Sequence, residues 1–249
     1  MSSPLGANVF ITGANRGIGL GLVKEMLAVG GLKNVFAGCR DVDSAAELQQ
    51  LHDKNGPLRL IRIDVSDDRS IRTAFGQVQR QLLDKGGLNL LINNAGILYK
   101  EGVSLREPIR DTFLHHFDVN TVGPVMTTAA FLPLLKKAAS AGEFARVVNI
   151  GSSLGCIGQA AVSPRLSPYQ NVAYGMSKAA LHHFSKMMAL DESDIVTVAI
   201  HPGWVKTEMG GANATMSVSD SVAKIMARIC ALTKSDSGKL LYGEKELMP

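Results

Sequence analysis

TGANRGIG, residues 12–19, is the stretch from which the fold of this chain can be inferred. Its glycines, Gly13, Gly17 and Gly19, come directly after a short apolar run and open an amphipathic helical pattern. Glycine permits a tight turn between a strand and a helix, and it lets the backbone approach a pyrophosphate at the positive end of that helix. The spacing differs from the commoner G-x-G-x-x-G, and an ordinary strand–helix turn is the plain alternative. Because the stretch opens an α/β pattern, we expect a dinucleotide to bind there.

Outward from this turn, short apolar runs alternate with longer helical patterns. Near-continuous apolar runs are typical of parallel strands that are covered on both faces. We expect strands at residues 8–12, 34–39, 58–63, 88–93, 146–150, 195–201 and 240–242. We expect helices at residues 18–29, 111–139, 173–190 and 217–232, with two more between the second and fourth strands.

This alternation predicts an α/β fold, a Rossmann-type doubly wound parallel sheet with helices on both faces. The sheet should have about seven strands in the order 3-2-1-4-5-6-7. We expect residues 1–249 to form a single domain, in which residues 201–232 are the substrate-side loop and helix.

Local signals predict how several helices begin and bend. Ser44 and Glu47 form a capping-box pattern before the second helix, and Ser66 or Asp67 can cap the third. Pro124 lies inside the long pattern at 111–139, and proline lacks the N–H that the carbonyl of residue 120 would otherwise accept. We therefore expect a kink that leaves this carbonyl open to an ordered water. A tolerated kink without functional meaning is the alternative.

The composition excludes several kinds of protein. The 249 residues carry a net charge of +4, and no basic run interleaved with aromatic residues predicts a nucleic-acid groove. The three cysteines and six histidines lack the spacing of a zinc site or a disulfide framework, so we expect no metal. No apolar stretch is long enough to span a membrane, and the first residues lack the pattern of a secretory signal. We expect a cytoplasmic protein.

Tyr174 and Lys178 lie four residues apart in a helical pattern, so their side chains project from the same face. A free phenol has a pKa of about 10 and exchanges protons poorly at neutral pH. An ammonium group beside it favours the phenolate and lowers that pKa. The pair is therefore a candidate general acid–base group, although such a pair also occurs in helices by chance.

The residues at the end of the second strand predict which dinucleotide binds. An acidic residue there accepts from the ribose of NAD, whereas a basic one accommodates the 2′-phosphate of NADP. Here Cys39 is followed by Arg40, and Arg16 in the glycine stretch offers a second guanidinium. Asp41 could instead pair with Arg40 at the surface. We expect NADP(H).

Together with motifs farther along, these residues resemble the short-chain dehydrogenase/reductase family. The motifs are, in order, residues 12–19, NNAG at 93–96, NTVG at 120–123, the serine pair at 152–153, YGMSK at 174–178 and PGWVKT at 202–207. The resemblance spans residues 7–210. The phrase HPGWVKTEMGG at 201–211 is most similar to the sniffer-type carbonyl reductases and the related C-factor-like branch.

The resemblance implies a role for each matching residue. Tyr174 is the general acid–base, and Lys178 lowers its pKa and binds the nicotinamide ribose. Ser153 holds the substrate oxygen, and Asn120 supports a water that relays protons to Lys178. From the residues alone, Ser153 and Tyr174 could both hydrogen-bond one carbonyl oxygen. The residues expected to bind NADP(H) are Gly13, Asn15, Arg16, Gly17, Ile18, Gly19, Arg40, Asp64, Val65, Asn93, Ala95, Gly96, Tyr174, Lys178, Pro202, Gly203, Val205 and Thr207.

One departure from the family lies between Ser153 and Tyr174, whose interval is longer than usual. The extra residues fall within Gly155–Asn171, a stretch that we expect to form a loop beside the site. Its candidate pocket or lid residues are Gln159, Pro164, Leu166 and Tyr169.

The expected function is that of an NADPH-dependent carbonyl reductase acting on an aldehyde or ketone. The apolar surroundings of the pocket and the resemblance favour a lipid-derived or xenobiotic carbonyl over a charged metabolite. One alternative is an NADP(H)-binding sensor or signalling protein of the same fold, and another is an alcohol dehydrogenase working in the oxidative direction. A nucleotide-sugar epimerase would need a larger substrate domain than the residues after Thr207 provide. Small residues in the fourth and fifth helices suit close packing between subunits, although they suit packing on the sheet equally well. The resemblance to a family that often forms dimers or tetramers implies a homodimer or homotetramer.

Overall fold

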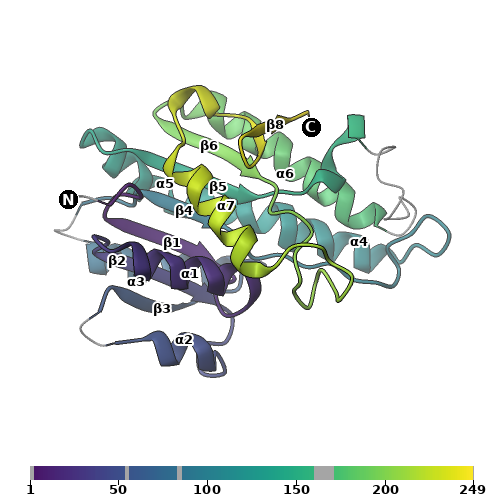
Figure 1. Ribbon diagram of the computed structural model, residues 1–249, viewed down its shortest axis with the longest axis horizontal. Helices are drawn as coiled ribbons and strands as arrows, with labels where there is room; N and C mark the ends of the chain where they lie inside the picture. The colour runs from purple at the N-terminus through teal and green to yellow at the C-terminus, as the bar shows by residue number, and fades with distance from the viewer. Residues whose placement is uncertain (1–2, 54–55, 83–85, 160–170, 249) are drawn as a thin grey trace.

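A single eight-stranded sheet forms the centre of the molecule, with helices on both faces (Figure 1). The computed structural model describes residues 3–53, 56–82, 86–159 and 171–248. The strand order is β3-β2-β1-β4-β5-β6-β7-β8, and every neighbouring pair is parallel except β7 and β8. The strands are β1 Asn8–Thr12, β2 Asn34–Cys39, β3 Leu58–Arg62, β4 Leu90–Asn93, β5 Ala145–Ile150, β6 Ile195–Ile200, β7 Leu240–Tyr242 and β8 Lys245–Leu247.

The helices connect successive strands, as a doubly wound sheet requires. The main helices are α1 Gly17–Val29, α2 Ala46–Leu51, α3 Asp68–Leu82, α4 Arg110–Phe117, α5 Gly123–Ser140, α6 Val172–Asp191 and α7 Val218–Cys230. Between α4 and α5 lies the π-helical turn η1, Asp118–Val122. The short 3-10 turns are η2 Ser153–Gly155, η3 Ile157–Gln159 and η5 Lys234–Asp236.

Two apolar layers hold the helices against the sheet. Alternate strand residues point to opposite faces, so Val9 and Ile11 pack with α1, α2 and α7, while Phe10 packs with α3 and α5. Phe10 meets Phe131 of α5 at a ring-centroid distance of 4.6 Å. The sheet is therefore covered on both sides, which explains the near-continuous apolar strands.

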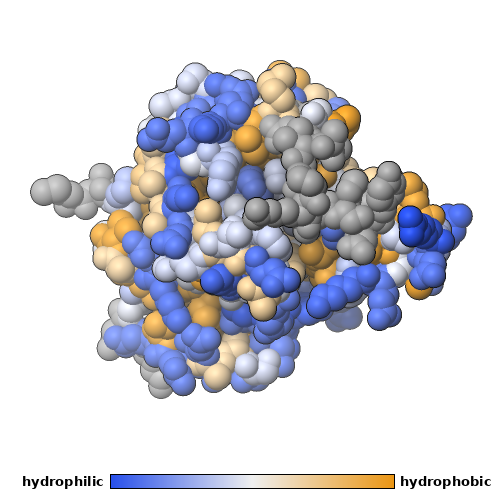
Figure 2. Space-filling view, turned by 45° about the vertical axis from the view of Figure 1, so that its right-hand side comes forward, coloured by the Kyte–Doolittle hydropathy of each residue, from blue (hydrophilic) through white to orange (hydrophobic). Residues whose placement is uncertain are grey.

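The predicted fold class and strand order are confirmed, and the ends of the strands agree closely. The strand β8 was missed, because its sequence Lys245-Glu246-Leu247 is mostly polar and only extends the open edge of β7. In the described ranges, no helix is long and apolar enough to cross a membrane. On the face in Figure 2, hydrophilic and hydrophobic residues are interspersed.

The helix signals were correct in part. Asp67 accepts from the Arg69 N–H at 2.8 Å at the start of α3, and Ser217 caps α7, as expected. The capping box at Ser44 is wrong, because α2 begins at Ala46 and has no side-chain cap. The continuous helix expected at 111–139 is divided by η1, so the irregularity near Pro124 takes the form of a π-helical turn.

The topology places one site at the carboxyl edge of the sheet. After β1 the chain turns through α1 to β2 on one side, whereas β4 and β5 lie on the other. This change of direction leaves a crevice beyond the ends of β1 and β4, where ligands bind in open α/β sheets.

Candidate active site

The turn between β1 and α1 has the geometry of an anion site. Gly13 and Gly17 have φ values of +66° and +54°, which other residues adopt only with strain. A Cβ on Gly19 would collide with the carbonyl oxygen of Gly13. Arg16, the residue just before α1, makes no side-chain cap, so its side chain does not occupy the first amides of the helix.

Asn94 fixes this turn from the neighbouring strand, and the sequence-based list of site residues omitted it. Its amide donates to the carbonyls of Thr12 at 2.9 Å and Gly13 at 3.0 Å. The Thr12 hydroxyl in turn accepts from the N–H of Asn94 and of Ala95, each at 3.1 Å. The motif at 93–96 was the available signal. Asn93 points the other way, into the core, so a contact of Asn93 with a cofactor would come from its backbone.

The core partners of Asn93 are Thr128 at 3.0 Å and Asn149 at 2.8 Å. These bonds link β4 to α5 and β5 beneath the site. Their donors and acceptors lie wholly inside the protein.

The residues expected at the adenosine end lie apart from the catalytic groups. Arg40 is exposed just after β2, and within the described ranges no ion pair occupies its guanidinium. Asp41 is not the surface partner of Arg40; it lies 3.9 Å from Arg62 and accepts from the N–H of Asp43 and of Ser44. Arg40 is thus available to an anion.

The expected adenine contacts follow β3. Asp64 accepts from both the N–H and the hydroxyl of Ser66, which orders the turn before α3. Val65 is buried against Gly123, where a Cβ would come within 2.8 Å of the Val65 carbonyl.

The Arg16 side chain contacts the loop after β6, which the sequence did not predict. Its guanidinium forms an ion pair with Glu208, which lies in the loop after β6. Thr207 of the same loop approaches the glycine turn, since a Cβ on Gly17 would lie 3.3 Å from the Thr207 methyl group. The loop therefore faces the start of α1 across the crevice.

The loop after β6 is held by its own contacts. Trp204 donates from Nε1 to the Gly210 carbonyl at 2.9 Å, and Gly210 donates to the Thr207 hydroxyl at 3.1 Å. The Ser221 hydroxyl of α7 donates to the Pro202 carbonyl at 2.7 Å. Together these bonds give the loop a defined shape beside the crevice.

Asn120 lies in the π-helical turn and is fully buried. Its side chain accepts from the Ile97 N–H at 2.8 Å and donates to the Ile97 carbonyl at 3.0 Å and the Ser177 hydroxyl at 3.1 Å. Asn120 thus joins the loop after β4 to α6. The water expected on its backbone carbonyl stays a prediction.

Lys178 is buried beneath the site, and its ammonium donates to the Ile150 carbonyl at 2.7 Å. The Nζ atom lies 5.6 Å from the centre of the Tyr174 ring. Burial lowers the pKa of Lys178 to about 8, because the charged form loses water.

Tyr174 has a high pKa in this structure. Burial raises the pKa to about 12, and hydrogen bonding from Ser152 opposes that rise. Burial is the larger effect on this pKa, and the expected lowering of the Tyr174 pKa by Lys178 stays a prediction.

The serine beside the Tyr174 hydroxyl is Ser152, whereas the sequence had favoured Ser153. The Ser152 hydroxyl also accepts from the Leu154 N–H at 3.2 Å, and the residue is buried at the end of β5. Ser153 instead begins η2, and its N–H donates to Nδ1 of His201 at 3.3 Å. Both serines line the cavity described next, but Ser152 is the one that hydrogen-bonds with the phenol.

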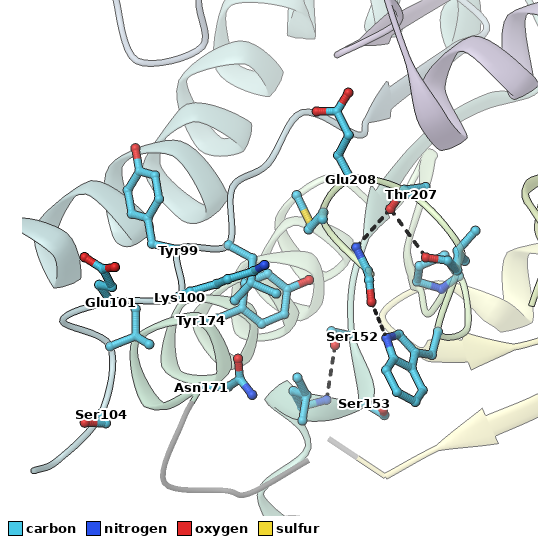
Figure 3. A pocket seen from close by; sticks show the side chains of 18 of the residues that line it. Tyr99, Lys100, Glu101, Ser104, Ser152, Ser153, Asn171, Tyr174, Thr207 and Glu208 are labelled. Atoms are coloured by element: carbon cyan, nitrogen blue, oxygen red, sulfur yellow. Dashed lines mark hydrogen bonds between the residues drawn. The ribbon is translucent and has the colours of Figure 1, made fainter. Parts of the chain in front are cut away.

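A cavity of about 1300 Å³ adjoins these groups. Several predicted residues line it: Ile18, Ser153, Tyr174, Pro202, Gly203, Val205 and Thr207. Figure 3 shows Tyr174 between the loop that carries Tyr99, Lys100 and Glu101 and the loop that carries Thr207 and Glu208. Arg40, Asp64 and Val65 do not line the cavity. Of the expected lid residues, Gln159 ends η3, and Pro164, Leu166 and Tyr169 lie outside the described residues.

No cluster of three or more possible metal ligands occurs in the part of the chain that the structure describes. The site brings the Tyr174 phenol and the Ser152 hydroxyl to the cavity, with the Lys178 ammonium group buried behind them and the glycine turn at the start of α1.

Known proteins resemble this chain in sequence and in fold. The family model described as short chain dehydrogenase matches residues 7–217. A carbonyl reductase from chicken fatty liver, solved with NADPH bound, is 38% identical, with a TM-score of 0.89 over 97% of this chain and 98% of that chain. The carbonyl reductase Sniffer of D. melanogaster is 34% identical, with a TM-score of 0.87 over 95% of this chain and 96% of that chain. The short-chain dehydrogenase anuI of Penicillium roqueforti is 31% identical over 248 residues, 96% of this chain and 95% of that protein.

Proposed function

This chain belongs to the short chain dehydrogenase family of oxidoreductases, and from that premise we propose that it is an NADPH-dependent carbonyl reductase. The observation that carries the proposal is the meeting of Tyr174 and Ser152 at one cavity, with Lys178 buried behind them. A carbonyl oxygen placed between the phenol and the serine hydroxyl would receive two hydrogen bonds where negative charge develops during reduction.

NADPH fits the residues present. The glycine turn offers helix amides to the pyrophosphate, and the close approach of Gly13, Gly17 and Gly19 to their neighbours leaves no room for side chains. Arg40 and Arg16 are the candidates for the 2′-phosphate, and a phosphate would compete with Glu208 for Arg16. The related chicken enzyme was solved with NADPH, which supports the same cofactor here.

The remaining binding roles are assigned by position. We propose that the adenine lies near Asp64 and Val65, and that Asn15 and Ile18 flank the glycine turn. The backbone of Asn93, Ala95 and Gly96 would lie along the cofactor. The residues proposed for the nicotinamide end are Pro202, Gly203, Val205 and Thr207.

Bound NADPH supplies the hydride that the carbonyl carbon receives. Tyr174 donates its proton to the carbonyl oxygen, and Ser152 donates a hydrogen bond to the same oxygen, which yields an alcohol. Lys178 presents a positive charge behind the phenol and stabilises the phenolate that remains until solvent returns the proton. Ser152 replaces Ser153 in this scheme.

The raised pKa of Tyr174 suits its role as a proton donor. A phenol with a pKa of about 12 holds its proton at neutral pH, and reduction requires the protonated form.

The test is NADPH oxidation by the purified protein with a panel of aldehydes, ketones and quinones. We expect turnover that prefers NADPH to NADH and falls by about 10³-fold or more in Tyr174→Phe, which removes the proton donor. Tyr99→Phe is the matched control, because Tyr99 lines the same cavity but its hydroxyl contacts Nδ1 of His115 at 2.9 Å. NADPH binding without turnover on any carbonyl would instead support the sensor, and equal loss in both variants would remove Tyr174 from the mechanism.

A further inference from the structure

Two histidine rings hold the backbone of the serine pair. The Ser152 N–H donates to Nε2 of His182 at 3.3 Å, and the Ser153 N–H donates to Nδ1 of His201 at 3.3 Å. His182 comes from α6, and His201 follows β6 directly. Two consecutive amides are therefore bound by rings from different parts of the chain.

The backbone around Ser152 is shaped to sit against the His182 ring. A Cβ on Gly151 would lie 2.7 Å from Nε2 of His182, and a Cβ on Gly155 would lie 2.8 Å from its Cε1. No side chain fits at either position without moving the ring or the turn. Glycine on both sides of the serine pair thus allows the imidazole to reach the Ser152 amide.

His182 extends the catalytic face of α6 by one turn. Tyr174, Lys178 and His182 follow one another at intervals of four residues, which places them on one side of the helix. Each contacts the end of β5: Tyr174 meets the Ser152 hydroxyl, Lys178 binds the Ile150 carbonyl, and His182 binds the Ser152 amide. Helix α6, which carries Tyr174, therefore also contacts the backbone of Ser152 and fixes its position.

The rings can accept these bonds because they are neutral. Burial lowers the pKa of both His182 and His201 to about 4, and the nearby Lys178 charge acts in the same direction on His182. With Nε2 of His182 as acceptor, its Nδ1 carries the proton. Among the described residues that Nδ1 has no hydrogen-bond partner of normal geometry, although the Gly155 carbonyl is close enough to affect the ring. The acceptor on Nε2 is thus the ring atom that binds the Ser152 amide, and Nδ1 faces the Gly155 carbonyl.

We propose that His182 and His201 are positioning residues for carbonyl reduction, which fix the amides of Ser152 and Ser153 and so aim the Ser152 hydroxyl at the substrate oxygen. This inference rests on the proposed function. Neither ring touches the reacting atoms in this role. Their contribution is the orientation of a hydrogen-bond donor, to which transition-state stabilisation is sensitive.

The test uses substitutions matched to the nitrogen that each ring uses. The oxygen of Gln reaches about as far as Nε2, so His182→Gln keeps an acceptor and His182→Leu removes it. The oxygen of Asn corresponds to Nδ1, so His201→Asn and His201→Leu form the second pair. His183→Leu is the control, because His183 is the exposed neighbour on α6.

We expect each Leu variant to lower kcat for carbonyl reduction by about tenfold or more, with the KM for NADPH changed less than about twofold. The Gln and Asn variants should recover most of that loss, and the control should match the wild type. A second readout does not depend on activity: hydrogen exchange of the Ser152 amide, followed by NMR, should be fast in His182→Leu and slow in the wild type and His182→Gln.

The possible outcomes distinguish a failure of the proposed carbonyl reduction from a failure of the positioning role of the two histidines. A wild-type protein without carbonyl turnover refutes the proposed function, and the exchange of the Ser152 amide then still tests the bond. Wild-type kcat and slow exchange in His182→Leu overturn the positioning role, as does equal damage in the Gln and Leu variants. If the Leu variants fail to fold, the wild type and the polar variants decide. Fast exchange of the Ser152 and Ser153 amides in the wild type overturns the positioning role. Slow exchange, together with activity in His182→Gln and His201→Asn, supports the positioning role.

Discussion

Replacing Ser152 with alanine tests the structural assignment of the substrate-binding hydroxyl. Ser152 is buried, hydrogen-bonds with Tyr174 and accepts from the Leu154 N–H at 3.2 Å. Removing one preorganised donor to a developing oxyanion costs about 2.7–4 kcal/mol, or about 10²–10³-fold in kcat. Losing the bond from Leu154 should lower the free energy of unfolding by only about 1 kcal/mol. We therefore expect Ser152→Ala to fold and to lose most of its turnover.

Ser153→Ala is the matched variant, because its contact with His201 is made by the backbone N–H, which alanine retains. Its kcat should stay within about threefold of wild type, since no donor to the substrate oxygen is lost. Steady-state kinetics of NADPH oxidation, with a thermal melt for each variant, measures both effects. Collapse of turnover in Ser153→Ala together with wild-type turnover in Ser152→Ala would refute the assignment and restore the sequence-based one.

Four further predictions concern cofactor binding and the glycine turn. The pKa of Lys178 is lowered to about 8, so its charge is present below that pH and lost above it. The kcat/KM for NADPH should therefore be level up to about pH 7 and fall beyond pH 8. A profile that stays level to pH 10 would contradict this role of the Lys178 charge. Arg40→Ala should raise the KM for NADPH about tenfold or more and leave the KM for NADH unchanged. Glu208→Gln removes the ion pair with Arg16 and should therefore lower the Kd for NADPH in a binding titration. Asn94→Ala removes two bonds to the glycine turn and should lower the free energy of unfolding by about 1–3 kcal/mol in urea, and an unchanged midpoint would be inconsistent with that contact.

Much of the fold followed from the sequence, because a parallel sheet covered on both faces leaves an unambiguous signal. Runs such as Val9–Ile11 and Val35–Ala37 are apolar without alternation, and their order along the chain leaves few possible topologies. The strand β8 gave no such signal, since an edge strand need not be apolar.

The candidate site was harder to predict at the level of single side chains. Adjacent residues on an extended segment point in opposite directions, so the choice between Ser152 and Ser153 depends on how β5 meets α6. The direction of Asn93 into the core, the pairing of Asp41 with Arg62 and the turn held by Asn94 depend equally on neighbours from distant segments. The sequence showed only that the histidines lack the spacing of a zinc site, and a histidine that accepts a bond from a backbone amide has no pattern in the sequence.

The ion pair between Arg16 and Glu208 affects how the affinity for NADPH should depend on ionic strength. Both side chains are largely exposed, at 62% and 75%, so the pair is weak in physiological salt and its separation costs little. Dissolved ions screen this pair and the attraction between Arg16 and a phosphate alike. Because NADPH would exchange one contact for the other, part of the salt dependence cancels, and the affinity of this protein for NADPH should vary less between dilute buffer and cell-like salt than that of a site whose arginine is unpaired.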